Sequence, residues 1–161
     1  MPDLRDHKGV FFIKQKVANA CGTTGLVHAL INVRGFTSTE SFKEGGFLEN
    51  FYVEGQEMTP DERADALEKN VREVHAAKAQ LGSSKPQETA KAHFVTFVEV
   101  NGRVWELDGR LDGPIDRGEI KGSNLGIKVT PFIQRYIEMD KEEMKFSIIA
   151  LAPSTVSEGY Y

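Results

Sequence analysis

The sequence is poor in cysteine and has no long hydrophobic run, and each scarcity excludes a class of protein. Its single cysteine cannot form an intramolecular disulfide, and its four histidines lack the spacings that are typical of zinc ligands. No apolar stretch approaches the roughly 20 residues that span a bilayer. We therefore expect no metal or organic cofactor and no membrane partner, and any chemistry of the cysteine is that of a thiol.

Runs of basic residues are also absent, and the formal net charge is −4. Because nucleic-acid affinity comes mainly from clustered Lys and Arg, we expect no nucleic-acid partner and instead a protein partner with a basic surface. The start of the chain, MPDLRDHKG, lacks the basic and then apolar pattern of a signal peptide. We therefore expect a cytoplasmic protein, with the nucleus as the alternative compartment.

What is present is the composition of an ordinary folded protein, with 40% apolar and 27% charged residues. A chain of 161 residues can build one well-packed core. Because no internal repeat or linker divides the sequence, we expect a single domain over residues 1–161 that acts as a monomer.

The beginning of the sequence predicts a strand followed by a helix. The residues Val10 to Ile13 are apolar and favour a short strand. A polar connection then leads to CGTTGLVHALINV, for which Asn19 is the expected N-cap. The only cysteine, Cys21, therefore stands at the start of a helix.

Two further helices are expected before the middle of the chain. Residues Glu44–Val53 predict a short helix. The longer one begins at Thr59 and Pro60, where Glu62 completes a capping box. Its apolar positions recur at intervals of three and four residues and predict a buried face, made of Ala64, Leu67, Val71 and Val74.

The second half of the sequence predicts a hairpin, a helix and a strand. Strand-like runs flank Asn101-Gly102, which is the strongest short signal for a two-residue type I′ hairpin. A helix is expected to begin at Thr130-Pro131, and KFSIIALA at Lys145 to Ala152 predicts a buried strand. The expected fold class is therefore α+β, with an antiparallel sheet flanked by helices.

Cys21 is a candidate nucleophile because the exposed N–H groups and the dipole of a helix N-terminus favour an anion such as a thiolate. The alternative is that Cys21 is a packing residue, since cysteine is among the most buried residue types. Gly22 and Gly25 disfavour a helix, and the close approach of another backbone would explain both. Gln15 stands six residues before Cys21, a spacing that can place its side-chain amide beside the thiol as a donor to an oxyanion. The alternative is that Gln15 is a solvent-exposed glutamine.

The hairpin register supplies a second part of such a site. A two-residue loop at Asn101-Gly102 places Val95 opposite Asp108, on the same face of the hairpin. His93 lies two residues from Val95 on that face, so we expect His93 and Asp108 to be diagonal neighbours within reach of each other. A carboxylate that orients an imidazole is the third member of a catalytic triad. Singly, Asp108 could be a turn residue and His93 the polar start of a strand.

Two other features complete the prediction. His28 follows Cys21 by seven residues but stands among apolar residues, which indicates a hydrogen-bonded core histidine rather than a catalytic one. The polar stretch from Gly82 to Ala92, immediately before His93, predicts an exposed loop.

Several segments together resemble the ubiquitin carboxyl-terminal hydrolases, a family of papain-like thiol peptidases. They are QKVANACGTTGLVHALINV, TPDERADALEKN, HFVTFVEVNGRVWELDGRLDGPIDRG and KFSIIALA. In order and spacing they cover nearly all of the chain from about Gly9 to Ala152. Family members normally carry a strand and helices before the oxyanion glutamine, whereas fourteen residues precede Gln15 here. We therefore expect a shortened N-terminal part.

The resemblance implies a papain-like fold and a role for each candidate residue. Cys21 would be the nucleophile, His93 the general base and acid, Asp108 its orienting partner and Gln15 the oxyanion donor. Ubiquitin would be the partner, with its C-terminal tail passing under the Gly82 to Ala92 loop, so only small or unstructured adducts would be cleaved.

Two alternatives stay open from the sequence. The first is a truncated relative that binds ubiquitin or a regulatory partner without turnover. The second is another Cys-His-Asp acyltransferase that resembles the arylamine acetyltransferases, which a glutamine six residues before the cysteine disfavours.

Overall fold

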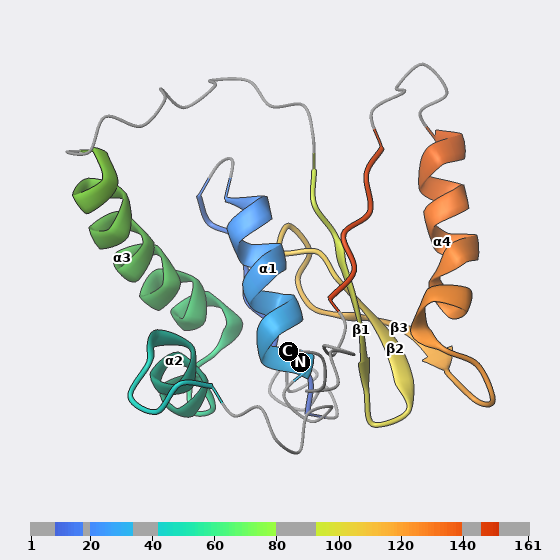
Figure 1. Ribbon diagram of the computed structural model, residues 1–161, viewed down its shortest axis with the longest axis horizontal. Helices are drawn as coiled ribbons and strands as arrows, with labels where there is room; N and C mark the ends of the chain where they lie inside the picture. The colour runs from blue at the N-terminus through green and yellow to red at the C-terminus, as the bar shows by residue number, and fades with distance from the viewer. Residues whose placement is uncertain (1–8, 18–19, 34–41, 80–92, 140–145, 152–161) are drawn as a thin grey trace, which may run out of the picture.

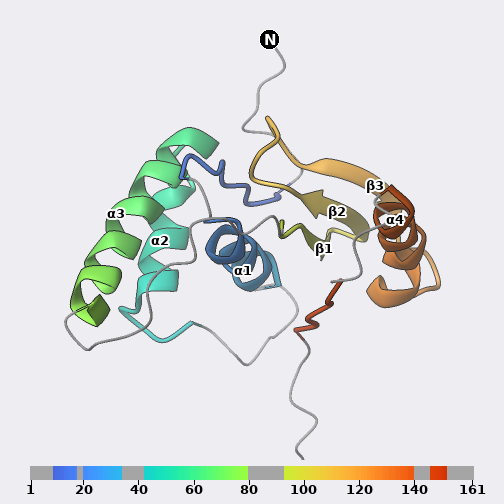
Figure 2. The same ribbon diagram turned by 90° about the horizontal axis from the view of Figure 1, so that it is seen from above.

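The computed structural model describes residues 9–17, 20–33, 42–79, 93–139 and 146–151, except the side chains of 72–79. In this part of the chain, helices lie on both sides of a three-stranded sheet (Figures 1 and 2). Helix α1 lies between the sheet and the pair α2 and α3, and α4 covers the other side of the sheet. The elements are α1 (Cys21–Asn32), α2 (Phe47–Gly55), α3 (Pro60–Ala79), β1 (Thr96–Val100), β2 (Arg103–Leu107), β3 (Ile115–Glu119) and α4 (Leu125–Met139).

The sheet is antiparallel in the order β1-β2-β3, and the expected α+β class is confirmed. Strands β1 and β2 are joined at Asn101 and Gly102, whose φ angles of 53° and 72° are those that a type I′ turn requires. Thr96 pairs with Leu107, and Val98 pairs with Trp105. This is the register that the sequence predicted, and it carries His93 and Asp108 to one end of the hairpin.

The strand predicted for Val10–Ile13 is wrong, although the segment is extended and buried. It makes no strand ladder with the rest of the described chain. Its side chains alternate between two cores, so that Val10 and Phe12 pack against β1 and β2 while Phe11 and Ile13 pack against the helices. Burial on both sides explains why the residues are apolar. The segment pairs with no strand because side chains make the hydrogen bonds to its backbone N–H and carbonyl groups.

Side chains from two helices provide those hydrogen bonds. Asn32 of α1 accepts from the N–H of Phe11 and donates to its carbonyl, at 2.8 and 2.9 Å. His28 Nε2 accepts from the N–H of Ile13 at 2.9 Å. Arg63 of α3 donates to the carbonyls of Phe12 and of Gly55, at 2.9 and 2.7 Å. The segment leading to Gln15 is thereby fixed between α1 and α3.

Helix α3 begins as predicted, and α1 does not. The Thr59 N–H donates to Glu62 Oε2 at 2.7 Å and Thr59 Oγ1 accepts from the Glu62 N–H at 3.3 Å, which confirms the capping box. At α1 the cap position is held by Ala20, which has no side-chain acceptor, so the prediction of Asn19 as the cap is wrong. The short helix predicted over 44–53 is observed as α2.

Helix α4 begins five residues before the predicted start at Thr130, and Pro131 lies inside it. Asn124 Oδ1 accepts from the Ile127 N–H at 3.0 Å and caps the helix, which explains the earlier start. The prediction was wrong because it assigned Pro131 to the first helical position. Among the described residues, no helix is long and apolar enough to cross a membrane.

The buried strand predicted over 145–152 is also wrong for the residues that are described. Residues 146–151 are not in a strand, and all six are exposed, including Ile148 at 73% and Ile149 at 87%. Apolar composition predicted burial, but a strand also needs a partner edge, and within the described chain no strand pairs with this segment.

Candidate active site

The first feature of the site is a close pair of a histidine and a carboxylate. His93 Nε2 lies 2.9 Å from Asp108 Oδ1, and the two side chains are 23% and 15% exposed. The pair makes no hydrogen bond in this arrangement, so the contact is a close approach of the imidazole to the carboxylate. Asp108 Oδ1 also accepts the Arg110 N–H at 2.9 Å, which fixes the carboxylate.

The other ring nitrogen of His93 is available for chemistry. Nδ1 is buried and has no hydrogen-bond partner within the described chain, so it is not bonded to the Cys21 thiol here. With Nε2 turned toward Asp108, Nδ1 is the nitrogen left to exchange a proton with a nucleophile. Such hydrogen bonds are often formed only when substrate is bound.

Cys21 is the first residue of α1; its thiol is free, and the residue is only 7% exposed. The first ladder bond of the helix is donated by the Thr24 N–H to the Ala20 carbonyl, at 2.9 Å. The N–H groups of the first turn therefore have no ladder partner, and within the described residues no side chain caps them. An anion at Cys21 would meet these donors and the positive end of the helix dipole.

Close contact between α1 and the start of the hairpin brings Cys21 and His93 to one region. A Cβ added at Gly22 would lie 3.7 Å from the Phe94 ring, and one at Gly25 would lie 3.0 Å from Thr96 Oγ1. The Thr96 hydroxyl donates to the Gly25 carbonyl at 2.9 Å. The prediction that another backbone approaches both glycines is wrong: side chains of residues after His93 lie there, tightly at Gly25 and at an ordinary contact distance at Gly22.

Gln15 lies against the end of β2. Its N–H donates to the Gly109 carbonyl at 2.7 Å, so Gln15 is placed one residue from Asp108. The side-chain Nε2 donates to the Val17 carbonyl at 2.9 Å, and Oε1 is buried without a partner among the described residues. One Nε2 hydrogen remains for an oxyanion, and the bond to Val17 orients it.

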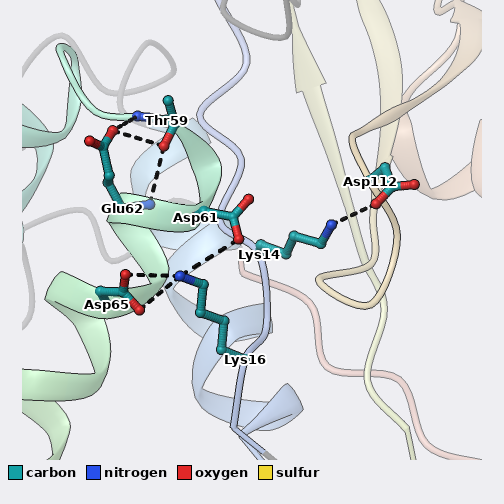
Figure 3. A network of polar contacts seen from close by, with 7 residues as sticks. All are labelled: Lys14, Lys16, Thr59, Asp61, Glu62, Asp65 and Asp112. Carbon is teal, nitrogen blue, oxygen red and sulfur yellow. Dashed lines mark hydrogen bonds and ion pairs between the residues drawn. The ribbon is translucent and has the colours of Figure 1, made fainter.

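The lysines on either side of Gln15 are anchored in different directions (Figure 3). Lys14 Nζ is 2.6 Å from Asp112, in the loop after β2. Lys16 Nζ is 2.8 Å from Asp65 and 3.6 Å from Asp61, both on α3. These pairs are solvent-exposed and individually weak, but together they tie both flanks of Gln15 to the fold.

The structure places His28 in the core, as predicted, and not in the site. Its ring is fully buried and stacks on Phe12, with the ring centroids 5.2 Å apart. Burial lowers the pKa of His28 to about 4 from the ordinary value of 6.5, and the hydrogen bond to the Ile13 backbone offsets this only in part. The ring is neutral at physiological pH.

Mild acid is therefore expected to destabilise the protein through His28. Between pH 6.5 and about 4 the unfolded chain binds a proton that the folded chain does not, so stability falls as the pH drops through this window. Urea unfolding should show a loss of roughly 2 kcal/mol between about pH 7 and pH 5 from this group. The His28→Asn variant should lack that part of the loss, and an equal loss in both proteins would contradict the assignment.

A buried network beside the site could not be seen in the sequence. Glu106 is fully buried, and its Oε2 accepts from Arg117 Nε at 2.8 Å and lies 2.7 Å from Nη2. Tyr136 of α4 donates to Glu106 Oε1. Burial and this bond raise the pKa of Tyr136 to about 12. Glu106 stands two residues before Asp108, so the network ties α4 to the strand that Asp108 directly follows.

Some predicted features lie outside the described residues. They include the whole of the segment from Gly82 to Ala92. Among the described residues, no group of three or more His, Cys, Asp or Glu could hold a metal ion. Cys21, His93, Asp108 and Gln15 supply a thiol, an imidazole, a carboxylate and an amide.

A sequence model described as ubiquitin carboxyl-terminal hydrolase, family 1, matches residues 3–138. The chain belongs to this family. It is 37% identical over 148 residues to ubiquitin carboxyl-terminal hydrolase 3 of Arabidopsis thaliana, covering 91% of this chain and 62% of that protein. It is 34% identical over 144 residues to the human isozyme L1, covering 88% of this chain and 63% of that one. The chain thus spans less than two thirds of the length of these relatives.

The solved structures to which this family member is similar support the same assignment. One is the UCH37 catalytic domain of Trichinella spiralis bound to ubiquitin vinyl methyl ester, with a TM-score of 0.64 and 25% identity. The match covers 84% of this chain and 60% of that one. The fold is therefore papain-like, as the resemblance implied.

Proposed function

We propose that this family member is a deubiquitinating cysteine hydrolase that cleaves small adducts or peptides from the C-terminal glycine of ubiquitin. The observation that carries the proposal is the pair of His93 and Asp108, 2.9 Å apart, beside the helix that begins at Cys21. The presence of ubiquitin vinyl methyl ester on a similar catalytic domain supports ubiquitin as the partner.

The reaction follows from the chemistry of these residues. His93 Nδ1 takes the Cys21 proton, and the thiolate attacks the carbonyl carbon of the terminal glycine. The Gln15 amide and the Cys21 N–H donate to the oxyanion. His93 then protonates the leaving group as its bond to the glycine breaks. Water, deprotonated by His93, releases ubiquitin as a carboxylate and restores the thiol.

Mass spectrometry with ubiquitin vinyl methyl ester tests this function. The 161-residue chain should gain one ubiquitin on Cys21, and the Cys21→Ala variant should gain none. If the folded chain stays unlabelled under conditions where an active thiol peptidase of this family is labelled, the proposal that this chain is an active enzyme is rejected.

A second candidate function is ubiquitin binding without turnover. It is favoured by one detail of the unbound site: His93 Nδ1 has no hydrogen bond to the thiol. A labelled chain that fails to hydrolyse a fluorogenic ubiquitin ester would select this function, since labelling needs one attack whereas turnover needs deacylation.

A further inference from the structure

Gly109 occupies a position beside Gln15 where the absence of a side chain matters. A Cβ at residue 109 would lie 2.9 Å from Gln15 Cβ, 3.1 Å from Gln15 N and 3.1 Å from Thr24 Cγ2. The first of these distances is shorter than two carbon atoms tolerate without movement. The Gly109 carbonyl meanwhile accepts the Gln15 N–H at 2.7 Å. Gly109 therefore sets how closely Gln15 approaches the end of β2.

Gln15 cannot easily move away from an added methyl group. The Lys14 N–H donates to the Pro60 carbonyl at 3.1 Å, and the Lys14 and Lys16 side chains reach Asp112 and Asp65 on opposite sides (Figure 3). Thr24, the other neighbour, is 4% exposed within α1. A larger residue at 109 would thus have to displace a backbone segment that is held on both flanks.

We propose that Gly109 is a positioning residue for the oxyanion donor, which it places by offering a carbonyl and no side chain to Gln15. The inference rests on the proposed function, because Gln15 acts on an oxyanion only during acyl transfer. Gly109 itself would contact neither ubiquitin nor the reacting atoms.

The Gly109→Ala variant tests the proposal through kcat and KM separately. With a fluorogenic ubiquitin ester, kcat should fall by about 10- to 100-fold and KM should change less than about threefold, because a displacement near 1 Å spoils a transition-state contact. The matched control is Gly126→Ala, where the added Cβ would meet Asn124 Oδ1 at an ordinary 3.4 Å. This variant should keep the kcat of the unchanged protein.

A double-mutant cycle shows whether Gly109 acts through Gln15 or through its neighbour Asp108. Gln15→Ala alone should lower kcat by about 10²- to 10³-fold, as the loss of an oxyanion donor does elsewhere. Adding Gly109→Ala should then lower kcat no further. A second drop of the same size in the Gln15→Ala background would overturn the proposal, because the effect would then not depend on the amide.

Two measurements separate a displaced Gln15 from a loss of folding and from a chain that is inactive on ubiquitin. If Gly109→Ala does not fold, the double variant Gly109→Ala with Thr24→Ser can replace it. Thr24→Ser removes the Cγ2 methyl group that would lie 3.1 Å from the added Cβ but keeps the clash with Gln15. The kcat of this double variant should still be low. Amide hydrogen exchange in the unchanged and Gly109→Ala proteins should show faster exchange at the Gln15 N–H in the variant. Unchanged exchange would overturn the proposal even in a chain that is inactive on ubiquitin, whereas inactivity alone would overturn only the proposed function.

Discussion

Replacement of His93 by alanine is expected to lower kcat on a ubiquitin ester by at least about 10⁴-fold, because proton transfer to and from Cys21 depends on it. Ubiquitin affinity should be nearly unchanged, since the ring is 23% exposed and acts at the reacting bond rather than over the ubiquitin surface. Steady-state kinetics and calorimetric titration with ubiquitin measure the two quantities. Free imidazole should restore part of the lost turnover.

Two controls make the His93 result interpretable. The urea midpoint of the variant should stay close to that of the unchanged protein, which excludes loss of the fold as the cause. Asp108→Asn should retain more activity than His93→Ala but less than the unchanged protein, at the same affinity, because it leaves the ring in place but weakens its orientation and the stabilisation of its charge. A His93→Ala protein that retains a tenth of the turnover would remove His93 from the mechanism.

The second large effect is on stability, at the buried carboxylate of Glu106. Arg117→Ala is expected to lower the free energy of unfolding by about 3 kcal/mol, because it leaves a fully buried charge without its cation. We place the value at the low end for such pairs because the Arg117 side chain is 25% exposed, so water screens the pair. Urea unfolding at neutral pH measures the change.

A matched basic residue provides the control for Arg117. Lys121 pairs with Glu119 but is 83% exposed, so Lys121→Ala should leave the unfolding midpoint unchanged within error. The double variant Glu106→Leu with Arg117→Met should recover most of the stability, since it removes both charges together. If that double variant is as unstable as Arg117→Ala, the cost does not arise from the unpaired charge.

Local chemistry explains which parts of the fold could be predicted. The Asn101-Gly102 turn fixes the register of β1 and β2 by itself, and Thr59 and Glu62 satisfy each other within one helical turn. Because the register followed from two residues, the proximity of His93 and Asp108 followed as well. Such features are formed by residues that are close together in the sequence, so the sequence alone is enough to predict them.

The parts that failed depend on partners far along the chain. Segment 10–13 has the pattern of a strand, but Asn32, His28 and Arg63 supply what a neighbouring strand would have supplied. The importance of Gly109 is invisible for the same reason, because Asp-Gly is a common turn dipeptide and the contact with Gln15 spans 94 positions. Glu106 gave no sign of burial, since its cation Arg117 stands on another strand.

The backbone bonds of the segment before Gln15 have a consequence for how the oxyanion donor behaves. Its hydrogen-bond partners come from α1, from α3 and from the turn after β2, so no single element can loosen and leave the others in place. A surface loop fluctuates on its own, whereas this segment can open only when the packing around it opens. The orientation of the Gln15 amide therefore depends on the packing of all these elements together.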